Sequence, residues 1–214
     1  NYSHGHAIVR YKDLLYTFMN DSLKSLSFIY NQTLTISDWM NNITANVPNS
    51  GLFNYGMAIT GRGILIIYGG YTENSVITRR LRNLIKHQDL WMCDFSLSPL
   101  DFKLITDIGL NGGYSKVINL GGEIVSVIPS IVKENKRIMI MNVGKMQAFI
   151  VNVYEPSVQG RTGYGIICLT EIRCFLVGGY YIDRNNVQEL KPDGMVIDLT
   201  FLFASSLNWK SLID

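Results

Sequence analysis

One short motif occurs twice in this chain of 214 residues, and it constrains the fold more than any other feature. Residues 61–70 form an apolar strand with glycine on both sides, ending in Gly69-Gly70, and residues 173–179 end in the same way at Gly178-Gly179. An aromatic-Gly pair precedes each copy, and fourteen residues separate its tyrosine, Tyr55 or Tyr164, from the first glycine of the doublet. Repetition at a fixed interval indicates an architecture built from similar units.

The whole chain divides into four such units, which we place at residues 3–50, 54–109, 112–158 and 163–214. Each unit is interpreted as four short strands joined by tight turns. Successive units begin about 50 residues apart. In the second unit we expect strands at 55–60, 64–68, 89–95 and 102–105. In the first we expect strands at 14–18 and 26–30. No segment has sustained helical periodicity, and residues 79–86 could form at most a turn or two of helix. The sequence therefore predicts one all-β domain.

Glycine doublets and large aromatic residues have structural roles in such units. A glycine doublet after the second strand permits positive φ angles, so that the chain can leave the sheet sharply. An aromatic residue on the outer strand would fill the wedge between neighbouring sheets. We assign this role to Trp39 and Trp209, and to Phe102 in the second unit.

Taken together, these motifs resemble kelch repeats of the galactose oxidase/kelch propeller superfamily, in a style similar to kelch proteins on fungal or protist cell surfaces. The motifs are Tyr55-Gly56, Gly69-Gly70, Asp89-Leu90-Trp91, Asp94, Tyr164-Gly165, Gly178-Gly179, Asp198 and Trp209. The resemblance implies a β-propeller of four-stranded antiparallel blades. Kelch propellers usually have six or seven blades, so four imply a fragment, a small propeller or a partner that completes the ring.

Composition excludes some classes of partner. The formal charge of +2 gives no concentrated basic face for nucleic acid. The apolar runs are far shorter than the roughly 20 residues that cross a bilayer, and no segment resembles a signal peptide. We expect no nucleic-acid partner and no membrane span within this chain.

Cysteines and sequons bear on the compartment. Cys168 and Cys174 would lie opposite each other across a tight hairpin, either bonded as a disulfide or as two buried thiols. Early sequons at Asn20, Asn31 and Asn42 fit the glycosylation pattern, as does one at the first residue. An extracellular or cell-surface location is one interpretation, and a cytoplasmic location is the alternative.

The resemblance implies a non-catalytic module that binds a protein through loops between strands. The candidate binding loop is the insertion at residues 71–88, which could grip an acidic partner. Its basic residues are Arg79, Arg80, Arg82, Lys86 and His87. A solvated insertion without a partner is the plainer alternative.

Two further functional classes stay open. An enzyme of the same superfamily would resemble a copper radical oxidase, which requires a Cys-modified Tyr, a second Tyr and two His ligands. The histidines are His4, His6 and His87, and His6 is better interpreted as an ordinary strand residue. We therefore expect no metal and no cofactor, and turn capping explains Asp94 and Asp198 better than acid-base chemistry. The other class is a structural part of a larger surface protein.

Overall fold

The computed structural model describes residues 6–19, 21–27, 39–42, 44–73, 84–107, 110, 113, 115–128, 137–152, 164–170, 173–182, 188–190, 194–200 and 210–211. Every named element within them is a β-strand. None of the described segments forms a helix long and apolar enough to cross a membrane.

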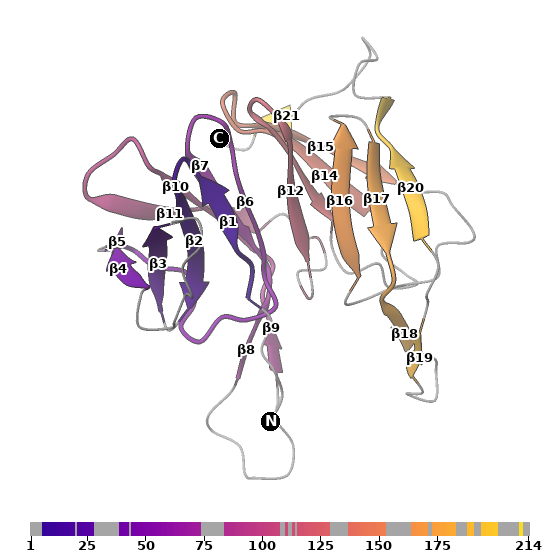
Figure 1. The fold of residues 1–214 in the computed structure, drawn as a ribbon, viewed down its shortest axis with the longest axis horizontal. Helices are drawn as coiled ribbons and strands as arrows, with labels where there is room; N and C mark the ends of the chain where they lie inside the picture. Colours follow the sequence, from indigo (N-terminus) through magenta and orange to yellow (C-terminus); the bar gives the residue numbers. More distant parts are fainter. Residues whose placement is uncertain are drawn as a thin grey trace.

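Four small antiparallel sheets are arranged in a ring, as in a four-bladed β-propeller (Figure 1). The first strands of successive blades are in contact, β1 with β6, β6 with β12 and β12 with β16. This arrangement confirms the predicted all-β propeller class. Blade one contains β1 (Val9–Tyr11), β2 (Leu14–Met19), β3 (Ser22–Ser27) and β4 (Met40–Asn42).

Blades two and three each have four consecutive antiparallel strands and a fifth strand at the outer edge. In blade two the outer strand β5 (Thr44–Ala45) pairs with β11 in parallel, and in blade three β21 (Lys210–Ser211) pairs with β15. The other strands of blade two are β6 (Gly56–Ile59), β7 (Ile64–Tyr68), β10 (Asp89–Asp94) and β11 (Leu100–Asp107). Those of blade three are β12 (Lys116–Gly121), β13 (Ile124–Ile128), β14 (Arg137–Asn142) and β15 (Gln147–Asn152).

Blade four contains three paired strands among the described residues. These are β16 (Gly165–Thr170), β17 (Arg173–Val177) and β20 (Gly194–Asp198). Two short hairpins are inserted after the glycine doublets. They consist of β8 (Tyr71–Glu73) with β9 (Leu84–Lys86) in blade two, and of β18 (Tyr180–Ile182) with β19 (Gln188–Leu190) in blade four.

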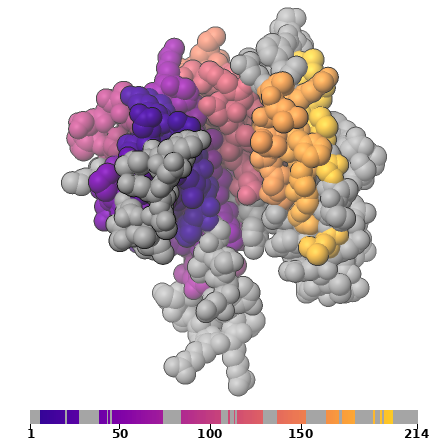
Figure 2. All heavy atoms as spheres, viewed as in Figure 1, coloured from indigo at the N-terminus to yellow at the C-terminus, as the bar shows by residue number. Residues whose placement is uncertain are grey.

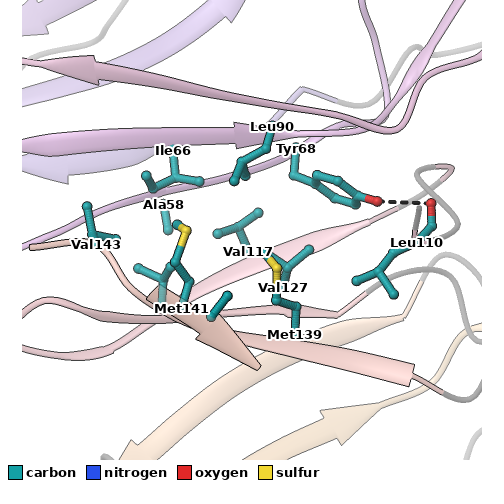
Figure 3. Packing of buried hydrophobic residues seen from close by; sticks show 12 residues of the cluster. Ala58, Ile66, Tyr68, Leu90, Leu110, Val117, Val127, Met139, Met141 and Val143 are labelled. Carbon is teal, nitrogen blue, oxygen red and sulfur yellow. Dashed lines mark hydrogen bonds between the residues drawn. The ribbon is translucent and has the colours of Figure 1, made fainter. Parts of the chain in front are cut away.

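Three buried clusters lie between successive blades. Between blades two and three, Ile66 and Tyr68 from alternate positions of β7 lie in one cluster with Val127 of β13 (Figure 3). Other clusters join blade one to blade two and blade three to blade four. A central strand such as β7 must be apolar along its whole length, because its two faces contact different neighbours.

Tyrosine side chains link neighbouring blades through hydrogen bonds. The Tyr55 hydroxyl donates to the carbonyl oxygen of Phe18 and accepts from its backbone N–H at 3.2 Å. In the equivalent place, the Tyr164 hydroxyl donates to the carbonyl oxygen of Ile128 at 3.3 Å. Both tyrosines are almost fully buried, so burial raises the pKa of each phenol. The tyrosine of the repeated Tyr-Gly pair therefore fastens its blade to the preceding one.

The two glycine doublets adopt one conformation. The φ angles are 67° and 98° at Gly69 and Gly70, and 67° and 93° at Gly178 and Gly179. These angles lie where residues with a Cβ are disfavoured. A Cβ on Gly70 would lie 2.8 Å from the carbonyl oxygen of Phe53. The doublets turn the chain from the second strand into the inserted hairpin.

The aromatic residues that were expected to fill the space between blades differ in how deeply they are buried. Phe102 of β11, the fourth strand of blade two, is 1% exposed and meets Phe18 of blade one edge to face, with ring centroids 5.9 Å apart. Trp91 and Trp39 are half-buried, Trp91 against the cluster between blades one and two. Trp209 lies outside the described residues.

Three expectations about elements differ from the structure. The third strand of blade one is Ser22–Ser27, four residues earlier than predicted, because Asp21 supplies the positive φ that a glycine would otherwise provide. Residues 84–86, in the segment where at most a turn or two of helix was allowed, are strand β9. The last strand, β21, pairs with blade three rather than extending blade four.

Candidate interaction surface

Two hairpins project from the same side of the molecule, toward the bottom of Figure 1. We call the residues of β8, β9, β18 and β19 the hairpin face. Each hairpin follows a glycine doublet directly and leads back to the third strand of its blade, β10 or β20. The insertion in blade two is therefore shared by blade four. The second hairpin was not predicted, although its place after Gly178-Gly179 was a usable signal.

Backbone and aromatic contacts hold the base of the β8–β9 hairpin. Tyr71 and Phe53 exchange two backbone hydrogen bonds of 2.8 and 2.9 Å, and their rings lie 6.2 Å apart. The backbone N–H of His87 donates to the carbonyl oxygen of Gly70 at 3.0 Å. An isolated two-stranded hairpin is marginally stable in water, so this base fixes its direction.

The ring of His87 completes the attachment. Its Nδ1 lies 3.0 Å from Asn49 Nδ2, and its Nε2 lies 2.8 Å from Thr72 Oγ1. Because the Asn49 amide nitrogen can only donate, Nδ1 accepts and Nε2–H donates to Thr72. Burial lowers the pKa of His87, against the opposing effect of Asp89, whose Oδ2 lies 3.7 Å from Nδ1. A neutral imidazole fits this network.

Apolar side chains are exposed on both hairpins. Leu84 and Ile85 of β9 are 45% and 47% exposed, and Lys86 beside them is also exposed. On the second hairpin, Leu190 is 80% exposed. Leu84 and Ile85 point to opposite sides of a strand, so the hairpin is exposed to solvent on both faces.

The basic residues predicted for this loop fall into two groups. Lys86 lies on β9 and is exposed, as a binding residue would be. The side chain of His87 is only 16% exposed and both of its ring nitrogens are engaged within the molecule, so its role here is attachment of the hairpin. Arg79, Arg80 and Arg82 lie outside the described residues.

Two of the three cysteines form a disulfide, and the third is free. Cys168 and Cys174 are directly opposite in the β16–β17 pair and form a disulfide, one of the two arrangements considered from the sequence. Cys93 is free and 1% exposed, and burial raises the pKa of its thiol to about 11. At neutral pH this thiol is protonated, which makes it a poor nucleophile.

Of the predicted sequons, the structure describes the one at Asn42. The Nδ2 atom of Asn42 donates to the carbonyl oxygen of Leu23 at 3.3 Å, and its Oδ1 accepts from Ser25 at 3.4 Å. The same nitrogen would carry a glycan, and the one N–H that it keeps would have to make this hydrogen bond between β3 and β4. Asn20 and Asn31 lie outside the described residues.

The histidine and aspartate residues considered in the enzyme hypothesis do not form a group of ligands or a pair of carboxylates among the described residues. His6 is exposed, with its ring 6.1 Å from that of Tyr55, and His4 lies outside the described residues. Among the described side chains, no three His, Cys, Asp or Glu residues are grouped as metal ligands would be. Asp94 accepts hydrogen bonds of 2.8 and 2.7 Å from the backbone and hydroxyl of Ser96, and Asp198 accepts the same pair from Thr200. These bonds confirm the predicted turn caps.

The topology defines the class of this protein, a four-bladed β-propeller arrangement. No family model matches the chain, and no curated protein matches it. Among solved structures it is similar to that of YjhT, with 9% identity over 90% of this chain and 81% of that chain, at a TM-score of 0.49. Hsv2 from Kluyvelomyces marxianus is more distant, with 8% identity over 89% of this chain and 83% of that chain, at a TM-score of 0.24. The class therefore rests on the protein's own sheets.

Proposed function

We propose that this protein is a non-catalytic, kelch-type binding module that holds a partner protein at the hairpin face. The observation that carries the proposal is the placement of two hairpins after equivalent glycine doublets, both exposing apolar side chains. Leu84, Ile85 and Leu190 would be left unburied at an energetic cost if they had no partner. A rigid scaffold that presents loops in this way is the usual arrangement of a binding surface.

The chemistry of the hairpin face favours a particular kind of partner. The exposed leucine and isoleucine side chains suit an apolar patch. Lys86 and the three arginines between β8 and β9 in the sequence suit a surrounding rim of carboxylates. The partner is therefore expected to be an acidic protein with an exposed apolar patch.

We further propose that the protein works outside the cell or on its surface. The Cys168–Cys174 disulfide supports this location, because disulfides persist in oxidising compartments.

The test compares three forms of the immobilised protein. These are the wild type, a hairpin variant with Leu84, Ile85 and Leu190 all changed to Ser, and a control with Leu104 and Ile150 changed to Ser. The control residues are 53% and 46% exposed on β11 of blade two and β15 of blade three. Proteins from the producing cells are cross-linked to each form, and retained candidates are purified and titrated for Kd.

The proposal predicts a partner that binds the wild type and the control alike and binds the hairpin variant at least tenfold more weakly, about 1.4 kcal/mol. A second variant with Arg79, Arg80 and Arg82 changed to Ser should flatten the dependence of binding on salt. Equal binding by the wild type and the hairpin variant would overturn the proposal.

A further inference from the structure

Blade four has one face that no other described blade covers. Its strands alternate between side chains that are buried against blade three, such as Cys174 and Leu176, and side chains that are exposed. The exposed apolar members are Ile167 (60%), Leu169 (74%), Phe175 (38%), Val177 (43%) and Val196 (61%). We call these five residues the open face. Ile167, Phe175 and Val196 are directly opposite one another across β16, β17 and β20, so the open face is continuous.

Equivalent positions in blade two are packed against the next blade. The glycine doublets and the strand register align β16, β17 and β20 with β6, β7 and β10. Four of the five open-face residues have an aligned residue in blade two at the contact between blades two and three: Ala58, Ile66 and Tyr68 are buried members of that cluster, and Met92 packs against it. The aligned pairs are Ala58 with Ile167, Ile66 with Phe175, Tyr68 with Val177 and Met92 with Val196. The open face thus has the residue types of a blade-to-blade interface without a blade against it.

The described residues of blade one do not supply that missing contact. Each buried cluster joins consecutive blades, and none includes residues of both blade four and blade one. Blade four lies at one side of the molecule, beyond blade three, and blade one lies toward the other side (Figure 2). The remaining face of blade one also has buried side chains already, including Thr17 (0%) and Leu26 (4%).

The size and the rim of the open face suit a second copy of the chain. Its five side chains expose on the order of 500 Å² of apolar surface, near the upper end for the largest patch of a monomer. A stable interface buries about 800 Å² on each partner, so the open face and a narrow rim would suffice. At one end of the open face, Arg173 and Asp198 form an exposed ion pair of 3.7 Å. A rim with both signs of charge is complementary to itself across a two-fold axis.

We propose that the protein forms a symmetric dimer in which the open faces of two copies pack against each other. Two sheets then meet face to face, as they do within the chain, and the apolar rows of β16, β17 and β20 interdigitate. In this arrangement Arg173 of each copy can reach Asp198 of the other at the rim.

The oligomeric state tests the proposal. Light scattering after gel filtration should give twice the chain mass of 24.2 kDa for the wild type at micromolar concentrations. A variant with Ile167→Lys and Val196→Lys should elute as a monomer with the circular dichroism and Tm of a folded protein. The matched control, Leu104→Lys with Ile150→Lys, changes two side chains of similar exposure and should remain dimeric. A monomeric wild type, or a dimer that survives in the Ile167→Lys and Val196→Lys variant, would overturn the proposal.

A cross-linking experiment keeps the proposal testable even if the lysine variant does not fold. Val196→Cys should form a disulfide-linked dimer under mild oxidation, because Val196 lies in the central row of the open face. Ile150→Cys, exposed on blade three, should not. If the wild type is a monomer whose open face is protected from hydroxyl radicals, the face is covered by the chain itself and the dimer is refuted.

Discussion

Replacing Gly70 with alanine should destabilise the fold through both backbone conformation and crowding. Gly70 has a φ of 98°, and a Cβ there would lie 2.8 Å from the carbonyl oxygen of Phe53 and 3.1 Å from side-chain atoms of Leu52 and Tyr55. The φ angle costs about 1–3 kcal/mol for a residue with a Cβ. Crowding against backbone that cannot move freely costs about 1–3 kcal/mol more. Reduced freedom of the unfolded chain returns about 0.4–1 kcal/mol.

The net loss for Gly70→Ala is therefore about 1–5 kcal/mol, with a central value of about 3 kcal/mol. In a chain of this length, that lowers Tm by roughly 10 °C. The assay is thermal and urea unfolding followed by circular dichroism, with the midpoints compared at one pH and one salt concentration. Hydrogen exchange at β8 and β9 should also increase, because Gly70 aims the hairpin.

Gly122→Ala is the matched control. Gly122 also has a positive φ, 54°, but nothing lies within 4 Å of the Cβ that alanine would add. This replacement should cost about 1 kcal/mol, since it carries the conformational penalty without the crowding. If Gly70→Ala lowers Tm no more than Gly122→Ala does, the crowding against Phe53 is not what selects glycine at this position.

Two further predictions concern the blade linkage and the hairpin base. Tyr55→Phe removes the hydroxyl that bonds both backbone groups of Phe18, and it should lower the free energy of unfolding by about 1–3 kcal/mol in urea titrations. A change below 0.5 kcal/mol would mean that the ring alone links the blades. Burial lowers the pKa of His87 in the folded hairpin, so the unfolded hairpin binds a proton more readily and stability falls as the pH drops below about 6.5. The protection factors of the Leu84–Lys86 amides, which are exchange rates corrected for the intrinsic rate at each pH, should therefore decrease between pH 7.5 and 5. His87→Gln should abolish that decrease, and an equal pH dependence in both forms would refute the reasoning.

The inner strands of the propeller were predictable because their pattern is local. Ile64–Tyr68 was expected at its observed bounds, and Arg137–Asn142 is an apolar run of the same kind. Their apolar runs end at glycine or asparagine, and burial on both faces requires such runs. Blade one was less predictable, because Asp21 takes the place of a glycine and the turn before β3 has no glycine signal.

Contacts between distant segments were not accessible from the sequence. The pairing of β21 with β15 depends on where the end of the chain meets blade three, and two-residue strands have no periodicity to detect. The same holds for the binding role assigned to His87. Its position in a basic loop suggested a free cation. In the structure, however, the amide of Asn49, 38 residues earlier in the chain, donates a hydrogen bond to its ring nitrogen. Residue type predicts chemistry, but only the packed neighbours decide whether that chemistry is available.

The two hairpins belong to blades two and four, with blade three between them. A partner that contacts both hairpins must therefore span the width of a blade, and its binding would be bivalent. Once one hairpin is engaged, the second binds at a high effective concentration because the propeller holds it in place. The affinity of each hairpin alone can then be low, and the partner can dissociate rapidly once either contact is lost. Rigidity of the ring, more than the strength of any single contact, would set the avidity of this protein.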